Sequence, residues 1–207
     1  MKAFPLLLLT ILGGLGSVLA APVSLFDGRS FDGWQGDIEK TWRIEEGSLV
    51  GGSLKEKVKH NQFLATTKSY GNFELRLKCK LVGTEGFVNA GIQIRSKRIP
   101  NHYEMIGYQA DMGEGYWGSL YDESRRNKML VTADKDVVAK ALKAGGEWVD
   151  YRVRCEGRRI QIWLNGVQTV DYTEQDENIE QTGMIAVQIH GDGKAEAWYK
   201  DIIIEEL

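Results

Sequence analysis

The sequence lacks a pronounced excess of charge of either sign. Its 207 residues include 26 Lys and Arg and 29 Asp and Glu, which gives a formal net charge of −3 at pH 7, with the two signs interspersed. Domains that bind nucleic acid or anionic membranes usually carry a basic patch or stripe. We therefore expect no nucleic-acid partner and no membrane partner for the mature protein, and we expect a neutral substrate.

Cysteine is also scarce, with only Cys79 and Cys155 present. Two lone cysteines do not supply the ligand set of a structural zinc site. Both lie on the apolar parity of strand-like runs, so they can serve as small core residues or, in an exported protein, pair as one disulfide. Both alternatives stay open, because the sequence does not give the separation of the two Cα atoms.

Long hydrophobic runs are absent except at the N-terminus, where residues 4–19 are almost wholly apolar and follow Lys2. The run ends in the small-residue cleavage pattern Val18-Leu19-Ala20, and it is too short and too rich in glycine to span a membrane comfortably. We predict a signal peptide over residues 1–20 and an exported protein, periplasmic or secreted. The absence of repeats, low-complexity segments and linkers predicts one domain over residues 21–207.

Short alternating runs separated by Gly, Asn and Asp make up most of the remaining chain, which is the pattern of an all-β protein. Residues 73–81 alternate apolar and charged side chains, and Glu46-Gly47 and Asn165-Gly166 are tight hairpin turns. Only Asp134–Ala144 is predicted as a helix, with Asp at its start and two glycines after its end. The number of strands favours two antiparallel sheets packed as a jelly-roll sandwich over a barrel.

Three of the predicted strands place small and polar residues on the parity opposite to their apolar residues. An ordinary solvated sheet face is one explanation, but Gln and Gly are poor strand formers on such a face. We therefore predict that these strands form the floor of a ligand site, with longer polar side chains converging beside small ones. The residues on this parity are Gly91, Gln93 and Arg95, then Gln109 and Asp111, and finally Ala186, Gln188 and His190.

The segment Gly107–Arg126 continues from one of these strands into a loop rich in glycine, aromatic and charged residues. Loops on a rigid scaffold are common places for binding and catalysis. Tyr116, Trp117 and Tyr121 offer aromatic faces that either stack on a sugar ring or shield the sheet edge. Glu123 and Arg125 add charge beside them, so we expect this segment to form a wall of the site.

Four motifs in order along the chain resemble those of the 3-keto-disaccharide hydrolase family. They are LFDGRSFDGW, NAGIQIRS, GEW followed by LNGV, and IAVQIHGDG followed by AWYKDIIIEEL, and they span nearly all of the chain after residue 20. The resemblance implies a concanavalin-A-like jelly roll acting on 3-keto-glycosides, by hydrolysis or by elimination followed by hydration. Family members commonly show Tyr-Glu-x-Gln where this chain has Gly107–Asp111, which makes Glu104 a second candidate for the family acid.

Laminarinase-type hydrolases, which share this fold, provide a chemical contrast. They carry E-x-D-x-x-E on one strand, whereas this chain has Gln109 at the nucleophile position, followed by Asp111 and Glu114. An amide cannot form the glycosyl ester of a retaining mechanism that uses two carboxylates. An ordinary endoglucanase is therefore not expected.

A ketone at C3 acidifies the hydrogen at C2, so cleavage can begin with proton removal by His190 or Asp111. Arg95 is expected to stabilise the enolate, and Tyr121 or Glu123 to assist the leaving group. No cofactor is required, although Asp111, Glu123 and His190 could instead hold a divalent cation. The predicted catalytic residues are His190, Asp111, Arg95 and Glu123, and the predicted substrate-binding residues are Gln93, Gln109, Gln188, Trp117, Tyr121 and Arg125.

Two other classes of function remain open. A non-catalytic carbohydrate-binding module on the same jelly roll needs the aromatic and amide side chains but no base, and it would bind unoxidised glycans without turnover. A structural or interaction sandwich would tolerate replacement of the polar strand residues without loss of sugar binding. Incubation with a keto-sugar beside an unoxidised control separates these classes.

Overall fold

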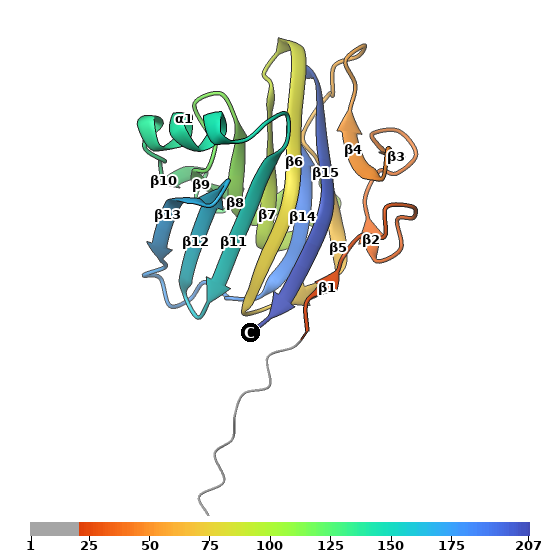
Figure 1. Cartoon of the computed structure of the whole chain (residues 1–207). Helices are drawn as coiled ribbons and strands as arrows, with labels where there is room; N and C mark the ends of the chain where they lie inside the picture. Colours follow the sequence, from red (N-terminus) through yellow and green to blue (C-terminus); the bar gives the residue numbers. More distant parts are fainter. Residues whose placement is uncertain (1–20) are drawn as a thin grey trace, which may run out of the picture.

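Two antiparallel sheets packed face to face form the domain (Figure 1). The structure is a computed structural model that describes residues 21–207, and the predicted signal peptide lies outside this range. Sheet A has eight strands in the described chain, in the order β13 (Val167–Thr173), β12 (Arg159–Leu164), β11 (Val149–Glu156), β6 (Phe73–Gly86), β15 (Gly193–Glu206), β4 (Ser48–Gly52) and β3 (Trp42–Glu45), with β1 (Val23–Ser24) paired to β15. Sheet B has seven there, in the order β10 (Lys128–Val131), β9 (Leu120–Glu123), β8 (Met105–Gly113), β7 (Asn89–Arg98), β14 (Gly183–Ile189), β5 (Gln62–Tyr70) and β2 (Trp34–Gln35).

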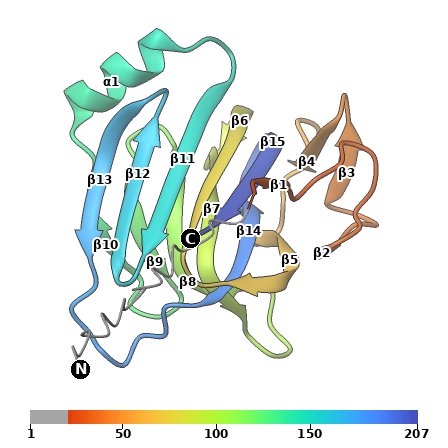
Figure 2. The same cartoon turned by 60° about the horizontal axis from the view of Figure 1, so that its bottom comes forward.

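The chain crosses between the two layers at β1 to β2, β2 to β3, β4 to β5, β5 to β6, β6 to β7, β10 to β11, β13 to β14 and β14 to β15. In Figure 2, β11, β12 and β13 are seen as one layer, with β7, β8 and β14 in the layer behind. The core between the layers joins Leu75 and Val153 of sheet A to Ile92, Tyr108 and other apolar side chains of sheet B. This arrangement confirms the jelly-roll sandwich predicted from the alternating runs.

Local sequence signals account for the turns and for the helix. Asn165 and Gly166 both adopt positive φ, 46° and 81°, as expected for the tight turn that joins β12 and β13. Helix α1 (Lys135–Ala144) begins after Asp134, whose carboxylate accepts the N–H groups of Asp136 and Val137 at 3.0 Å. The hairpin at Glu46-Gly47 and the helix are therefore confirmed. No helix in residues 21–207 has the length and apolar character needed to cross a membrane.

Both cysteines are free thiols buried in the core. Cys79 lies on β6 opposite Val149, and Cys155 lies on β11 opposite Phe73. Burial raises the pKa of Cys155 to about 12 and raises the pKa of Cys79 well above its ordinary value. Of the two alternatives, the structure shows the apolar core role, in thiols that form little thiolate near neutral pH.

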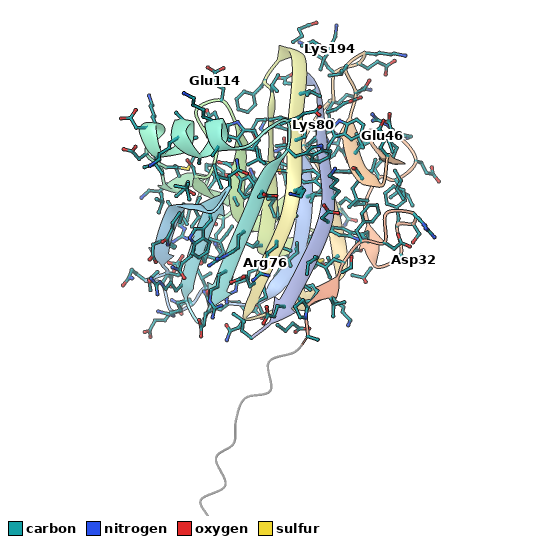
Figure 3. The ribbon with its side chains drawn as sticks, in the orientation of Figure 1. Asp32, Glu46, Arg76, Lys80, Glu114 and Lys194 are labelled. Atoms are coloured by element: carbon teal, nitrogen blue, oxygen red, sulfur yellow. The ribbon has the colours of Figure 1, made fainter. Side chains whose placement is uncertain are left out.

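The outer faces of the two sheets differ in kind. The outer face of sheet A is solvated and covered by ion pairs, as the side chains of Arg76 and Lys80 on β6 illustrate (Figure 3). Lys80 pairs with Glu147 at 2.9 Å, and its Nζ lies 4.4 Å from the ring centroid of Trp198. The outer face of sheet B instead buries polar side chains, among them Gln93, Gln109 and Asp111, as expected for the floor of a ligand site.

Candidate functional site

Three neighbouring strands of sheet B place polar side chains in register on its outer face. Gln188 of β14, Gly91 of β7 and Asp111 of β8 are consecutive partners across the sheet. Gln109 lies across Gly91, because a Cβ atom at Gly91 would come within 2.6 Å of the Gln109 side chain. The missing side chain of Gly91 therefore gives Gln109 the space to reach toward Asp111, as the shared parity predicts.

A cavity of about 230 Å³ opens on this face above β8 and β9. Its lining combines two carboxyl groups, two amides, one imidazole and three aromatic side chains. These residues come from the β6–β7 turn, β7, β8, the β8–β9 loop, β9 and the residue after β14. They are Phe87, Asn89, Gln109, Asp111, Tyr116, Tyr121, Glu123 and His190.

Asp111 forms the buried floor of the cavity, with only 4% of its surface exposed. Burial raises the pKa of its carboxyl group, the hydrogen bond from Gln109 Nε2 to Oδ1 at 2.7 Å opposes that rise, and the negative charge of Glu123 adds to it. The resulting pKa is about 7. A carboxyl group with such a pKa exchanges protons near neutral pH, which suits acid or base catalysis.

Glu123 lines the same cavity from β9 and also has a pKa raised to about 7, first by burial and then by the nearby charge of Glu104. Glu104 Oε1 accepts a hydrogen bond from Asn61 Nδ2 at 3.0 Å, while its Oε2 is buried without a partner. The second acid candidate, Glu104, is not among the residues that line the cavity, and it acts on Glu123 through its charge.

His190 and two aromatic rings form one wall. The Nδ1 of His190 lies 2.8 Å from the carbonyl oxygen of Gly191, which can only accept, so this contact assigns a proton to Nδ1. The Phe87 ring meets the His190 ring edge-on at 4.7 Å and the Tyr116 ring at 5.8 Å. Such a wall leaves Nε2 of His190 available to a ligand and offers apolar ring faces to a sugar.

Arg95 is not part of this wall, contrary to the sequence-based expectation. Its guanidinium donates to the carbonyl oxygens of Gly71 at 2.9 Å and Gly157 at 2.6 Å, and to Gln181 Oε1 at 2.7 Å. The residue has a positive φ of 48° at a register shift of β7 against both neighbouring strands. This β-bulge inserts one residue, so Ser96 instead of Arg95 continues the face of Gln93.

Trp117 and Arg125 also lie apart from the cavity. Trp117 packs against the core, with its ring 6.3 Å from that of Tyr151, and Tyr116 lines the cavity instead. Arg125 pairs with Asp122 at 2.7 Å, and its guanidinium lies 4.4 Å from the ring centroid of Tyr108. These placements correct the expectation that both residues contact the sugar.

Gln93 and Gln188 lie on the predicted face but beneath the cavity lining. Both are fully buried. Gln93 Nε2 donates to Gln109 Oε1 at 2.7 Å, whereas neither amide atom of Gln188 has a hydrogen-bond partner. Parity therefore identified the correct face for both glutamines, but it gave no information about their depth. Neither is among the residues that line the cavity.

The donor set does not fit a bound cation. Among the described residues, no group of three or more His, Cys, Asp or Glu side chains converges closely enough to ligate a metal ion. The alternative in which Asp111, Glu123 and His190 share a cation therefore has no support in the geometry.

Two residues of the lining were missed by the sequence reasoning, and a third was left between alternatives. Asn89 shares the parity of Gly91 and Gln93, so extending the β7 pattern by one step finds it. Phe87 follows the turn after Gly86 and shows no periodic signal. Tyr116 was one of several loop aromatics equally suited to shielding. Glu114, the last acid of the glucanase-like pattern, is exposed and does not line the cavity (Figure 3).

Comparison with known proteins bears on the family and the fold. The family model for the 3-keto-alpha-glucoside-1,2-lyase-like domain matches residues 21–205. Among solved structures, a candidate glycosyl hydrolase from Parabacteroides distasonis superposes with a TM-score of 0.65 at 20% identity, covering 90% of this chain and 94% of that one. No curated protein matches the chain in sequence.

Two further structures are similar in fold. The carbohydrate-binding module CBM66 from Bacillus subtilis gives a TM-score of 0.60 at 14% identity, with 82% of this chain and 93% of that chain covered. The β-glucanase of Bacillus licheniformis gives 0.56 at 8% identity, with 89% and 96% covered. At these identities the similarity shows the shared jelly roll, which both enzymes and binding modules use.

Proposed function

The chain belongs to the family of 3-keto-alpha-glucoside-1,2-lyase-like domains, and from this premise we propose that it cleaves 3-keto-glycosides in the cavity above β8 and β9. The observation that carries the proposal is the pair of cavity carboxyl groups, Asp111 and Glu123, each with a pKa of about 7. Near neutral pH such a pair supplies one ionised and one protonated carboxyl group, as elimination requires.

In the first step Asp111 takes the proton from C2 of the sugar. The C2–H electron pair moves into a C2–C3 double bond, and negative charge develops on the C3 oxygen. The hydroxyl of Tyr121 is the cavity donor suited to hold that oxygen, which replaces the role first expected of Arg95, whereas Nε2 of His190, with its proton on Nδ1, is an acceptor. The buried position of Asp111 favours uptake of the proton, because burial disfavours its charged form.

In the second step the C1–O bond breaks as the enolate collapses, and Glu123 gives its proton to the departing oxygen. The products are the free aglycone and an unsaturated 3-keto sugar with a C1–C2 double bond. Addition of water across that bond places hydroxyl on C1 and hydrogen on C2, so that the overall change is hydrolysis. Release before water adds would make the same site a lyase.

Turnover of a 3-keto-glucoside in D₂O tests the proposal. We expect release of aglycone together with deuterium at C2 of the hydrated sugar, or an unsaturated sugar with no hydrogen at C2 if release precedes hydration, because the C2–H bond breaks in the first step. The matching glucoside with a C3 hydroxyl is expected to be inert, since its C2 hydrogen is not acidic. Free keto-sugar incubated without protein measures the non-enzymatic exchange. Aglycone release with protium retained at C2 would contradict elimination and leave direct hydrolysis.

A non-catalytic binding module is the other outcome of this experiment. The ring faces of Phe87 and Tyr116, which are 40% and 37% exposed, would serve such a module equally well. It would bind the unoxidised glucoside and the keto-glucoside without releasing aglycone from either. A protein that binds neither sugar would fit the structural or interaction class.

We also propose that the protein is exported, because residues 1–20 have the composition of a signal peptide and the family match begins at residue 21. N-terminal sequencing of protein recovered from the periplasm or medium of the expressing cells is expected to begin at Ala21. An intact Met1 on protein retained in the cytoplasm would contradict export.

A further inference from the structure

A chain of hydrogen bonds runs beneath the cavity from Ser96 to Asp111. Ser96 Oγ donates to Gln93 Oε1 at 2.6 Å, Gln93 Nε2 to Gln109 Oε1 at 2.7 Å, and Gln109 Nε2 to Asp111 Oδ1 at 2.7 Å. All four side chains are at least 96% buried. A buried chain of this kind is strongly favoured only while every donor has an acceptor, so the orientation of each amide depends on the next one.

The two ends of the hydrogen-bond chain determine which atom of each amide donates and which accepts. An ionised Asp111 can only accept, so Gln109 must turn its amide nitrogen toward the carboxylate and its oxygen toward Gln93. Gln93 must then present its own oxygen to Ser96, whose hydroxyl donates. Gly107 makes room for that hydroxyl, because a Cβ at this position, where φ is +155°, would lie 2.1 Å from Ser96 Oγ. The backbone around Ser96 is therefore shaped to hold the far end of the chain.

We propose that Gln93 and Ser96 are positioning residues for Asp111. They decide which atom of Gln109 faces the carboxylate, so that one oxygen of Asp111 is held and the other is left free for the proton of the substrate. Neither residue is among those that line the cavity. The inference rests on the proposed function where it treats Asp111 as the base. The hydrogen-bond chain from Ser96 to Asp111 does not depend on that reaction.

The experiment follows the titration of Asp111 by carbon NMR of its carboxyl group in the labelled mature chain, without substrate. Gln93→Leu removes the amide that donates to Gln109, and Ser96→Ala removes the hydroxyl at the far end of the hydrogen-bond chain. Both weaken the support that the Gln109 N–H gives to the ionised carboxylate. We expect the titration midpoint to rise by about 0.5 to 1 unit in Gln93→Leu and by less in Ser96→Ala.

Ser119→Ala is the matched control. Ser119 is also a buried serine beside Asp111, since its carbonyl accepts the Asp111 N–H at 3.0 Å, but its hydroxyl accepts the Ala133 N–H and lies outside the chain. Its replacement is expected to cost stability without moving the midpoint. An unmoved midpoint in Ser96→Ala, or an equal shift in Ser119→Ala, would overturn the proposal, and Ser96→Ala decides alone if Gln93→Leu does not fold.

Kinetics separate this inference from the proposed function. If the 3-keto-glucoside is turned over, the rise of kcat/KM with pH is expected to shift in the same order among the variants. If no keto-glycoside is turned over while the titration still shifts, the positioning chain stands and the proposed function fails. If turnover occurs without any titration shift, the proposed function stands and the positioning chain fails.

Discussion

Replacing Asp111 with asparagine is expected to remove turnover of a 3-keto-glucoside and, at the same time, to stabilise the fold above pH 7. Asparagine keeps the acceptor for Gln109 but has no basic oxygen, so kcat/KM should fall by about 10²- to 10⁴-fold, the usual contribution of a positioned general base. The stability gain follows from burial, because ionised Asp111 is held in a site that disfavours its charge. The same substitution is therefore expected to lower kcat/KM and to raise the stability of the fold above pH 7.

The gain in stability should depend on pH in a defined direction. The folded-state pKa of Asp111 is raised from 3.8 to about 7, so its favourable contribution is fully present below about pH 4 and is lost as the pH rises through 7. Above that pH the carboxylate costs up to about 4 kcal/mol relative to a group with an unshifted pKa. Asp111→Asn should therefore differ little from the parent at pH 4 and be more stable at pH 8.5.

Urea unfolding at pH 4 and pH 8.5 measures this difference. The control is Glu114→Gln, which removes one carboxylate from the same segment but at an exposed position, so that neither stability nor turnover should change. A constant difference between Asp111→Asn and the parent at both pH values would mean that Asp111 has an ordinary pKa. Unaltered turnover in Asp111→Asn would remove this residue from the mechanism.

The sequence predicted the fold well because its signals are local. Alternation of apolar and polar residues specifies strands, Asn165-Gly166 specifies a hairpin, and Asp134 caps the helix without help from distant residues. The sandwich then follows, since strands with one apolar face must bury it against another layer. Little in the tertiary packing overrides these preferences.

The site was less predictable, for three physical reasons. Parity placed Gln109, Asp111 and His190 on the face that carries the cavity, but it failed at Arg95, where a bulge reverses the direction of the side chain. Loop residues have no period, so nothing in the sequence distinguished Tyr116, which lines the cavity, from its neighbour Trp117. The burial of Gln93 and Gln188 depends on which other segments cover the sheet, and alternation within one strand carries no information about that cover.

Replacing Arg126 with methionine is expected to give the largest loss of stability, because two buried carboxylates depend on it. Asp122 is fully buried and Glu174 is 1% exposed, and the guanidinium of Arg126 bonds both, reaching Glu174 Oε2 at 2.7 Å. Breaking a buried ion pair by removing one partner costs about 3 to 5 kcal/mol; here Glu174 loses its ion pair, whereas Asp122 keeps the one with Arg125. Arg159→Met, which breaks an exposed pair with Asp171, should cost no more than about 1 kcal/mol.

The pH dependence identifies the cause of that loss. Burial alone would raise the pKa of Glu174, but hydrogen bonds, led by the one from Arg126, outweigh it and lower the pKa to about 2. A depressed carboxyl pKa contributes stability above its unfolded value and loses it as the pH falls through the folded one. The difference between Arg126→Met and the parent in urea unfolding should therefore be largest above pH 5 and shrink toward pH 2. A difference that is the same at pH 3 and pH 7 would point to lost packing of the Arg126 side chain.

Arg126 also connects the stability of the fold to the site. Asp122, which it holds, lies on β9 between Tyr121 and Glu123, and alternation along the strand sends those two side chains toward the cavity while Asp122 points inward. The ion pair therefore anchors the strand that carries the proposed leaving-group acid. In Arg126→Met we expect kcat to fall even under conditions where the variant is fully folded, whereas Arg159→Met should retain parental kcat. Parental kcat in folded Arg126→Met would show that β9 keeps its place without this anchor.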